Sequence, residues 1–495
     1  MKHRSKVKSA CVAVFVFYFV AACTNELEEI NKNPNNPEEI NPELLMVTIL
    51  RSTINQMVDE AFTTGNLVAQ YAAKIREPDV DRYIWGSFGT WNNGYVVLRD
   101  VNNLYAIADE RGLDNYKGIA LIMRALIFSR MTDAYGDLPY SQALKGKEED
   151  PVYSPVYDTQ AEIYAGLLAE LEEANQLLST SGGSIRNDIL YGDGSYVGDP
   201  IKWKKLANSL KLRLLVRQSN NVDPSQALQA IVNNPSQFPI FTSNDDQATL
   251  AYVETPNLYP VTSYRVGHWL DRRLSKTFAD WMNTTSDPRL KVLATPTTES
   301  QETGPLEWNG VRNGEEDANL GSDIDAKVSA LGEIFYQDLL VPVKAEGLVM
   351  TFAEVQFILA EAAQRGWISG DAKVYYLNGI NASAEYYEQV SGVDIELTDD
   401  FLENPDVKFT DINALELIGM QKWVALYFND LQGWHEWKRT GIPTLQPAIV
   451  NNNNDQIPVR FKYPIGQQET NRSNYESAVA RQGEDDINTK LWWQQ

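Results

Sequence analysis

Several long stretches of the chain carry apolar residues at the three- and four-residue spacing of a single helix face. This spacing predicts amphipathic helices, and so a mostly α-helical fold. The clearest stretches lie at 116–131, 203–214, 355–362 and 417–431, with a further helix around Trp91 and Tyr95.

Two of the apolar positions suggest how the helices are arranged. Trp203 and Leu206 fit the opening W-x2-L of a tetratricopeptide repeat, but the rest of that motif and a steady period of about 34 residues are absent. The sequence therefore favours a degenerate array of helix pairs over a regular solenoid.

Long polar segments separate the helical stretches, and loops of this length in a compact domain are usually functional or mobile. They hold many of the aromatic residues, which make up 11% of the chain. We expect most of these rings to pack the loops onto the core and a few to remain for a binding surface. The segments are 181–200, 242–268, 295–331 and 443–468.

The N-terminus has the pattern of a bacterial lipoprotein signal. Four basic residues, at 2, 4, 6 and 8, precede a short apolar run at 10–20, and Val20-Ala21-Ala22-Cys23 resembles the motif cut before a lipidated cysteine. The run is too short for a membrane span, which needs roughly 20 residues. We expect a signal peptide at 1–22 and a lipidated Cys23, the alternative being an ordinary secretory signal with an incidental cysteine.

Composition after Cys23 divides the rest of the chain into two parts. Residues 23–42 are acidic and rich in Asn and Pro, a composition that cannot bury itself, and we expect a flexible tether there. Residues 43–495 should form the helical domain.

The charge balance restricts the partners. Removing residues 1–22 removes four positive charges and takes the formal net charge from −24 to −28, so nucleic acid is not an expected ligand. Cys11 leaves with the signal and Cys23 would carry the lipid, which leaves no pair for a disulfide or thiolate metal site.

Few residues suggest metal or catalytic chemistry. Of the three histidines, His3 leaves with the signal, while His268 and His435 have no ligand-type spacing near them, so no metal is expected. No nucleophile elbow, phosphate loop or catalytic thiol is present either. We expect a protein that is not an enzyme, with no catalytic residue and no cofactor.

Glu354 and Glu361 are the one tempting carboxylate pair. Seven residues apart on a helix, their backbones lie about 10.5 Å apart, beyond the roughly 6.5–9.5 Å between the carboxyl groups of inverting glycosidases. Both flank an apolar stripe, as do Arg213 and Arg217 on another helix. We therefore expect cross-helix ion pairs between the two helices rather than catalysis.

Several blocks of sequence together resemble the SusD/RagB family of outer-membrane lipoproteins, most closely its SusD-like branch, over Cys23 to Gln495. A single block would be weak evidence, but their number and order make chance a poor explanation. The blocks are Ile30-Asn31-Lys32-Asn33-Pro34-Asn35, Asp133-Ala134-Tyr135-Gly136-Asp137-Leu138-Pro139-Tyr140, Gly198-Asp199-Pro200-Ile201-Lys202-Trp203, Asp287-Pro288-Arg289-Leu290, Met350-Thr351-Phe352-Ala353-Glu354, Trp434-His435-Glu436-Trp437-Lys438-Arg439, Ile457-Pro458-Val459-Arg460 and Leu491-Trp492-Trp493.

The resemblance implies a fold of about four tetratricopeptide-like helix pairs with an irregular, loop-rich second half. It also implies a lipid-anchored protein on the outside of the outer membrane, which captures glycans and delivers them to a partner TonB-dependent (SusC-like) transporter. The acidic residues at 26–29 look like the export signal of such lipoproteins, although Thr24 and Asn25 separate them from the cysteine.

Three functions remain open from the sequence: a glycan-binding lipoprotein that feeds a transporter, a peptide-capturing RagB-like lipoprotein, and a cell-surface glycoside hydrolase. For glycan capture, flat aromatic rings in loops are the expected platforms, because sugar rings offer apolar faces. The candidate ligand-binding residues are Tyr83, Trp85, Tyr259, Tyr264 and Trp308.

Overall fold

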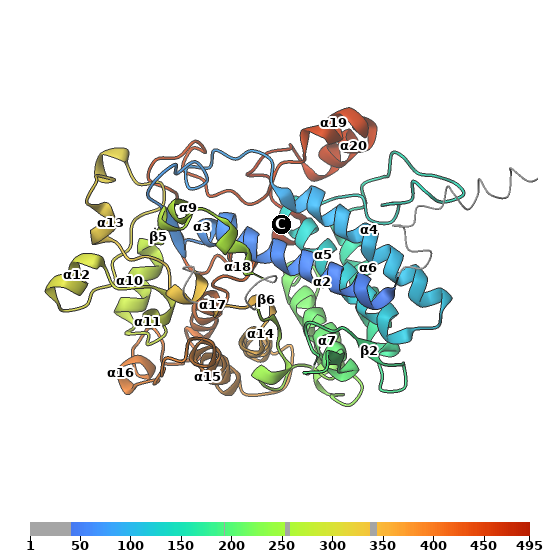
Figure 1. Cartoon of the computed structure of the whole chain (residues 1–495), viewed down its shortest axis with the longest axis horizontal. Coiled ribbons are helices and arrows are strands. Elements are labelled where there is room, and N and C mark those ends of the chain that lie inside the picture. Colours follow the sequence, from blue (N-terminus) through green and yellow to red (C-terminus); the bar gives the residue numbers. More distant parts are fainter. Residues whose placement is uncertain (1–40, 193, 253–257, 337–343) are drawn as a thin grey trace, which may run out of the picture.

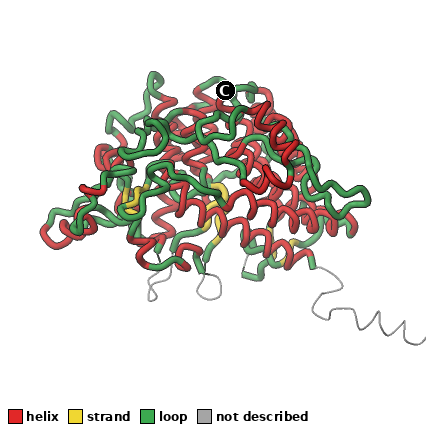
Figure 2. Tube along the Cα trace, turned by 90° about the horizontal axis from the view of Figure 1, so that it is seen from above, coloured by secondary structure: helices red, strands yellow, loops and turns green. Residues whose placement is uncertain are grey.

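The computed structural model describes residues 41–192, 194–252, 258–336 and 344–495. The predicted signal peptide, Cys23 and nearly all of the predicted tether lie outside these ranges. The described part is mostly helical, with a few short strands (Figures 1 and 2). No helix in it is both long and apolar enough to cross a membrane.

Nine helices form the scaffold of the described residues, and a short π-helical turn, η1 (Ala61–Gly65), extends the first of them. They are α2 (Pro42–Glu60), α4 (Gly89–Glu110), α5 (Asp114–Tyr135), α6 (Gln160–Leu177), α7 (Pro200–Arg217), α14 (Phe352–Gln364), α15 (Ala372–Ser391), α17 (Ala414–Ala425) and α18 (Gln432–Thr440).

Shorter helices lie mainly in the irregular segments and near the C-terminus. They are α3 (Asn66–Val68), α8 (Ser225–Val232), α9 (Val266–Leu270), α10 (Lys276–Thr284), α11 (Leu290–Leu293), α12 (Thr298–Thr303), α13 (Ile324–Lys327), α16 (Asp399–Leu402), α19 (Ile465–Thr470) and α20 (Arg472–Gln482), with 3-10 turns η2 (Asn244–Asp246), η3 (Pro260–Ser263), η4 (Asp317–Asn319), η5 (Glu333–Phe335) and η6 (Trp492–Gln494).

The scaffold helices pack on one another in sequence order. Helix α4 packs on α5, α5 on α6, α6 on α7, α7 on α14, α14 on α15 and α17, and α17 on α18. Figure 1 shows α4 to α6 on one side, α14, α15 and α17 in the middle, and the short helices α9 to α13 on the other side. The prediction of a mostly α fold with about four helix pairs is confirmed.

Helix starts follow local sequence signals. The Asn41 side chain accepts a hydrogen bond from the Glu43 backbone N–H, with Pro42 in the first turn of α2. Thr159 and Glu162 form a reciprocal capping box at the start of α6. Such caps satisfy backbone N–H groups that have no partner inside the helix, and so fix where each helix begins.

The predicted helix over 417–431 is wrong in its last third. Helix α17 ends at Ala425, and a turn with positive φ at Phe428 (60°) and Asp430 (48°) leads into α18. Apolar spacing continues through the turn because Tyr427, Phe428 and Leu431 are all buried. The periodicity therefore reports burial there, and not helix.

The described residues contain three small antiparallel ladders, two of which join segments far apart in the sequence. β1 (Ala72–Lys74) pairs with β5 (Arg272–Leu274), with Ala72 opposite Leu274. β2 (Ile185–Arg186) pairs with β3 (Val197–Gly198), and β4 (Ala248–Leu250) pairs with β6 (Gly347–Met350). The β2–β3 ladder lies within the predicted polar segment 181–200, whereas the β4–β6 ladder joins the segment 242–268 to the strand that precedes α14.

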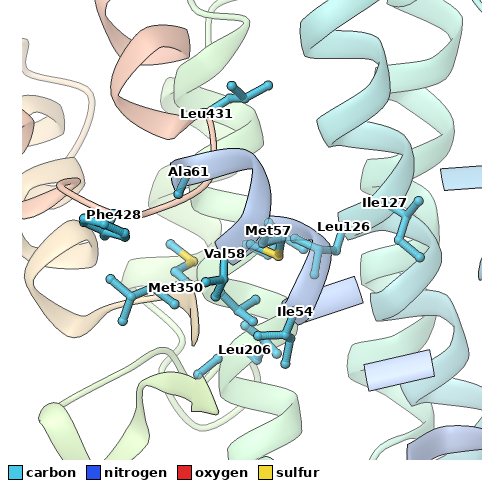
Figure 3. Packing of buried hydrophobic residues seen from close by; sticks show 14 of the residues in the cluster. Ile54, Met57, Val58, Ala61, Leu126, Ile127, Leu206, Met350, Phe428 and Leu431 are labelled. Atoms are coloured by element: carbon cyan, nitrogen blue, oxygen red, sulfur yellow. The ribbon is translucent and has the colours of Figure 1, made fainter. Parts of the chain in front are cut away.

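Helix α2 crosses the middle of the molecule and has one strongly apolar face. Ile54, Met57, Val58 and Ala61 point into a core formed by Leu126 and Ile127 of α5, Leu206 of α7, Met350 of β6, and Phe428 and Leu431 of the turn before α18 (Figure 3). Each of these four side chains, three from α2 and Ala61 from η1, is at most 2% exposed. The opposite face of α2 is thereby turned away from the core.

Buried ion pairs connect the helices. Arg213 of α7 binds Glu354 of α14 through two hydrogen bonds of 2.6 Å, which confirms the expected pairing between these helices. Glu361 pairs instead with Arg439 of α18, and Arg217 pairs with Asp133 of α5. Both members of the tempting carboxylate pair are therefore held by guanidinium groups.

Candidate functional site

A cavity of about 550 Å³ lies between α2 and the start of α4, and we call it the α2–α4 cavity. Its wall is dominated by hydroxyl, amide and charged side chains, with only a few apolar ones. The lining residues are Asn55, Gln56, Asp59, Glu60, Thr63 and Thr64 from α2 and η1, Val80, Ser87, Phe88, Gly89, Thr90 and Asn93 from the loop before α4 and its first turn, and Arg130, Pro260 and Arg272.

The polar face of α2 supplies one whole wall. Asn55, Gln56, Asp59, Glu60 and Thr63 recur at one-, three- and four-residue intervals, which places them together on the helix face opposite the apolar one. The π-helical turn η1 follows directly, and π-helical turns are frequent at functional sites.

Glu60 is the most unusual group in the wall. Its side chain is buried, and its Oε2 accepts a hydrogen bond of 2.9 Å from the Thr90 hydroxyl at the start of α4. Burial and the nearby Asp430 carboxylate raise the pKa of Glu60 to about 7. A carboxyl group that titrates near neutral pH in a cavity marks a candidate binding site.

Two guanidinium groups complete the wall, and each is held in place. Arg130 donates to both oxygens of Asp430 at 2.7 and 2.8 Å. Arg272 lies 4.0 Å from the centre of the Phe62 ring, and burial lowers its pKa to about 10, so it stays cationic at neutral pH. It donates to the backbone carbonyls of Phe62 and His268.

Two of the five candidate aromatic residues are buried. Tyr83 is 7% exposed, its hydroxyl accepts a hydrogen bond of 2.9 Å from the Ala448 N–H, and burial raises its pKa to about 12. Tyr259 is 1% exposed and packs edge-on against Tyr252 at 5.1 Å. In this conformation both rings stabilise the loops that carry them.

Two half-buried candidate aromatics lie around the α2–α4 cavity. Trp85 packs on Phe88, which lines the cavity, and its indole N–H donates to the Val80 carbonyl at 3.0 Å. The Tyr264 hydroxyl donates to Asp59 at 2.5 Å. The structure thus brings the neighbourhoods of Trp85 and Tyr264 to one cavity, although they are far apart in sequence.

Trp308, also half-buried, lies apart from the other four. Its indole N–H donates to the Ala294 carbonyl at 3.1 Å. Ala294 lines a second cavity of about 610 Å³, and this cavity shares Thr295 and Pro296 with a third of about 740 Å³ that includes Arg76 and Asp271. Trp308 is therefore a candidate for a different part of the surface.

The sequence-based prediction of binding residues considered aromatic residues in loops and did not include the polar side chains of α2. The signal was present, because residues 55, 56, 59, 60 and 63 are polar at helical spacing beside the apolar Ile54, Met57 and Val58. What the sequence lacked was the position of the residues at 87–93, which turn this polar face into a cavity wall.

The described residues offer no metal site of the usual kind. Nowhere in the described ranges are three His, Cys, Asp or Glu side chains grouped as a metal ion would require. His435 is fully buried, and burial holds its pKa well below the usual value.

The chain matches the family model SusD-like_2, described as starch-binding and associating with the outer membrane, over residues 34–464. No curated protein matches it. Among solved structures, it is similar to a SusD homologue of Bacteroides fragilis, with 30% identity and a TM-score of 0.77. The match covers 92% of this chain and all of that one.

Two further solved structures match over the same shares of the two chains. One is a Bacteroides vulgatus outer-membrane protein to which a role in nutrient binding is ascribed, with 29% identity and a TM-score of 0.79. The other is named a chitin-binding protein, with 28% identity and a TM-score of 0.78. The family model matches most of the chain, and the solved structures share its fold. The chain therefore belongs to the SusD-like family.

Proposed function

We propose that this protein captures oligosaccharides at the bacterial surface and holds them in the α2–α4 cavity. The observation that carries the proposal is the cavity wall, in which amide, hydroxyl and charged side chains surround Phe88 and Pro260. Sugars present hydroxyl groups around apolar ring faces, so a wall that combines polar side chains with apolar surface suits them. The chitin-binding name of one structural relative supports a glycan ligand.

Two amide side chains in the wall are available for a ligand. Gln56 of α2 and Asn93 of α4 line the cavity from opposite sides, and neither has a hydrogen-bond partner within the described part of the chain. An amide offers both donors and acceptors, which is the combination that vicinal hydroxyl groups require.

We further propose that the lipid on Cys23 anchors the protein and that a TonB-dependent transporter receives the captured glycan. The sequence around Cys23 and the outer-membrane association of the family support the anchor. The transporter follows from the family resemblance, and affinity pull-down from detergent-extracted membranes tests it. Repeated recovery of the lipoprotein without a β-barrel partner would count against it.

Binding of a panel of neutral oligosaccharides, including chitin and starch fragments, tests the proposed site. The purified chain from Thr24 onward should bind at least one of them. The double variant Gln56→Ala/Asn93→Ala should bind it about 5- to 150-fold more weakly, because each lost hydrogen bond costs about 0.5–1.5 kcal/mol. Asn103→Ala, an exposed position on α4 outside the cavity, is the matched control.

Each other outcome of this experiment has a defined meaning. New reducing ends during incubation would indicate a glycoside hydrolase. Binding of peptides but of no oligosaccharide would indicate a peptide-capturing protein. Undiminished binding by the folded double variant would place the glycan outside the α2–α4 cavity.

A further inference from the structure

The α2–α4 cavity has one more carboxyl group than guanidinium groups around it. Asp59 and Glu60 of α2 lie in its wall, together with Arg130 and Arg272, and Asp430 lies directly behind Arg130. Three carboxyl groups thus face two guanidinium groups. Once Glu60 is ionised, the net charge of this group of side chains is −1.

The two carboxyl groups of α2 receive their side-chain hydrogen bonds from neutral groups. Arg130 donates from Nε and Nη2, one edge of its guanidinium, to the two carboxylate oxygens of Asp430. Glu60 receives its hydrogen bond from the neutral Thr90 hydroxyl, and Asp59 receives one from the neutral Tyr264 hydroxyl. The Arg130 charge favours the ionised form of Glu60, but within the described residues no salt bridge joins Glu60 or Asp59 to a lysine or arginine.

An uncompensated carboxyl group in a buried position is costly, and a cation from outside would remove that cost. Burial already holds a proton on Glu60 up to a pKa of about 7, which is how the protein meets the cost when the cavity is empty of ligand. A bound cation at hydrogen-bond distance would displace this proton, because an opposite charge favours the ionised carboxyl group.

We propose that the α2–α4 cavity receives one protonated amine of its ligand, with Glu60 and Asp59 as the accepting carboxylates. This inference rests on the proposed capture of glycans and narrows their class to sugars with a free amino group. The amide and hydroxyl side chains around the two carboxylates, Asn55, Gln56 and Asn93 among them, then bind the neighbouring hydroxyl groups.

The site suits an ammonium group better than a metal ion. A divalent cation would exceed the single negative charge, and the described residues place no third carboxyl, histidine or cysteine beside Asp59 and Glu60 as a metal ligand. Arg272 does not block an ammonium group, since its Nε and Nη1 donate to backbone carbonyls and its face lies on Phe62.

Isothermal titration with a matched pair of ligands tests the proposal. The probes are the glucosamine trisaccharide and its N-acetylated counterpart, at about pH 6.5, in two buffers of different ionisation enthalpy. The free-amine trisaccharide should bind about tenfold more tightly, because charge-assisted hydrogen bonds are roughly twice as strong as neutral ones. Its binding should release up to about one proton, since Glu60 is mostly protonated at that pH.

Two variants assign the effect to the carboxyl group. Glu60→Gln should abolish both the proton release and the preference for the amine. Glu110→Gln removes the same charge from an exposed site at the other end of α4, and should change neither. Asp59→Asn should reduce the preference without abolishing the proton release.

Equal affinity for the two trisaccharides, or a preference that persists in folded Glu60→Gln, would overturn this inference while leaving glycan capture intact. Binding of the free-amine trisaccharide with no proton release would also overturn it. If no sugar of any kind binds, the proposed function fails first, and this inference fails with it.

Discussion

The Glu60 carboxyl group links the cavity to the stability of the fold. Its pKa of about 7 lies above the usual value of 4.5, so the folded protein holds this proton more tightly than the unfolded chain does. Stability therefore falls as the pH rises from about 4.5 through 7, by up to about 3 kcal/mol from this group.

Glu60→Gln should remove this loss of stability at rising pH, because glutamine does not ionise. We expect the variant to gain up to about 3 kcal/mol in the free energy of unfolding relative to the native protein between about pH 5 and about pH 8. Urea unfolding at the two pH values measures it. An identical pH dependence in the two proteins would show that Glu60 does not titrate near neutral pH.

Removing a carboxylate from the buried pair between Arg213 and Glu354 should destabilise the fold, whereas Glu60→Gln should stabilise it. Their side chains are 4% and 1% exposed, so Glu354→Ala leaves a buried guanidinium without its partner and should cost about 3–5 kcal/mol. Asp280→Ala breaks the exposed pair with Lys276 and should cost under about 1 kcal/mol. Thermal or urea unfolding measures both variants. Similar losses in the free energy of unfolding would mean that burial does not determine how much each ion pair stabilises the fold.

At the scale of elements, the π-helical turn η1 depends on a close backbone approach. A Cβ atom on Gly65 would lie 2.0 Å from the carbonyl oxygen of Asp430, a residue that itself binds Arg130. Side chains cannot be accommodated there without displacing the turn before α18. The shape of the cavity wall thus rests on a contact between segments far apart in sequence.

Gly65→Ala should therefore destabilise the protein by at least about 2 kcal/mol and weaken ligand binding, since overpacking against backbone is poorly relieved. Gly466→Ala, in α19 with open space around the glycine, should be neutral or stabilise by up to about 1 kcal/mol. Thermal unfolding checks both. A Gly65→Ala variant as stable as the native protein would contradict the close contact.

Local sequence signals predicted the helices well and the turns poorly. The stretches at 116–131, 203–214 and 355–362 became α5, α7 and α14, because apolar spacing within one helix is a local property. The break after Ala425 was not predictable in this way. It depends on Asp430 reaching Arg130, which lies 300 residues away in the chain.

At the scale of the whole molecule, the fold class and the helix pairs could be predicted from periodicity and family resemblance, whereas the candidate site could be only partly predicted. Trp85 and Tyr264 are near the cavity, but Tyr83 is buried through its contact with Ala448. Whether a loop aromatic faces solvent or core is decided by such long-range contacts, which spacing does not encode. The polar face of α2 could be predicted from the sequence. That it forms a cavity wall could not, because this depends on where the residues at 87–93 lie in the fold.

The lipid anchor is a property of the whole molecule as well. Cys23→Ala should release the protein from the outer-membrane fraction into the soluble fraction, because acyl chains on Cys23 would supply the stable anchoring that we propose. Fractionation followed by immunoblotting measures this. A variant that remains with the membrane would show that Cys23 is not the anchor.

The most direct test of the account is a crystal structure of the protein with the oligosaccharide that it binds most tightly. We predict a sugar residue in the α2–α4 cavity, within hydrogen-bond distance of Gln56 and Asn93 and beside Asp59 and Glu60. An oligosaccharide bound elsewhere on the surface, with the α2–α4 cavity occupied by water alone, would contradict it.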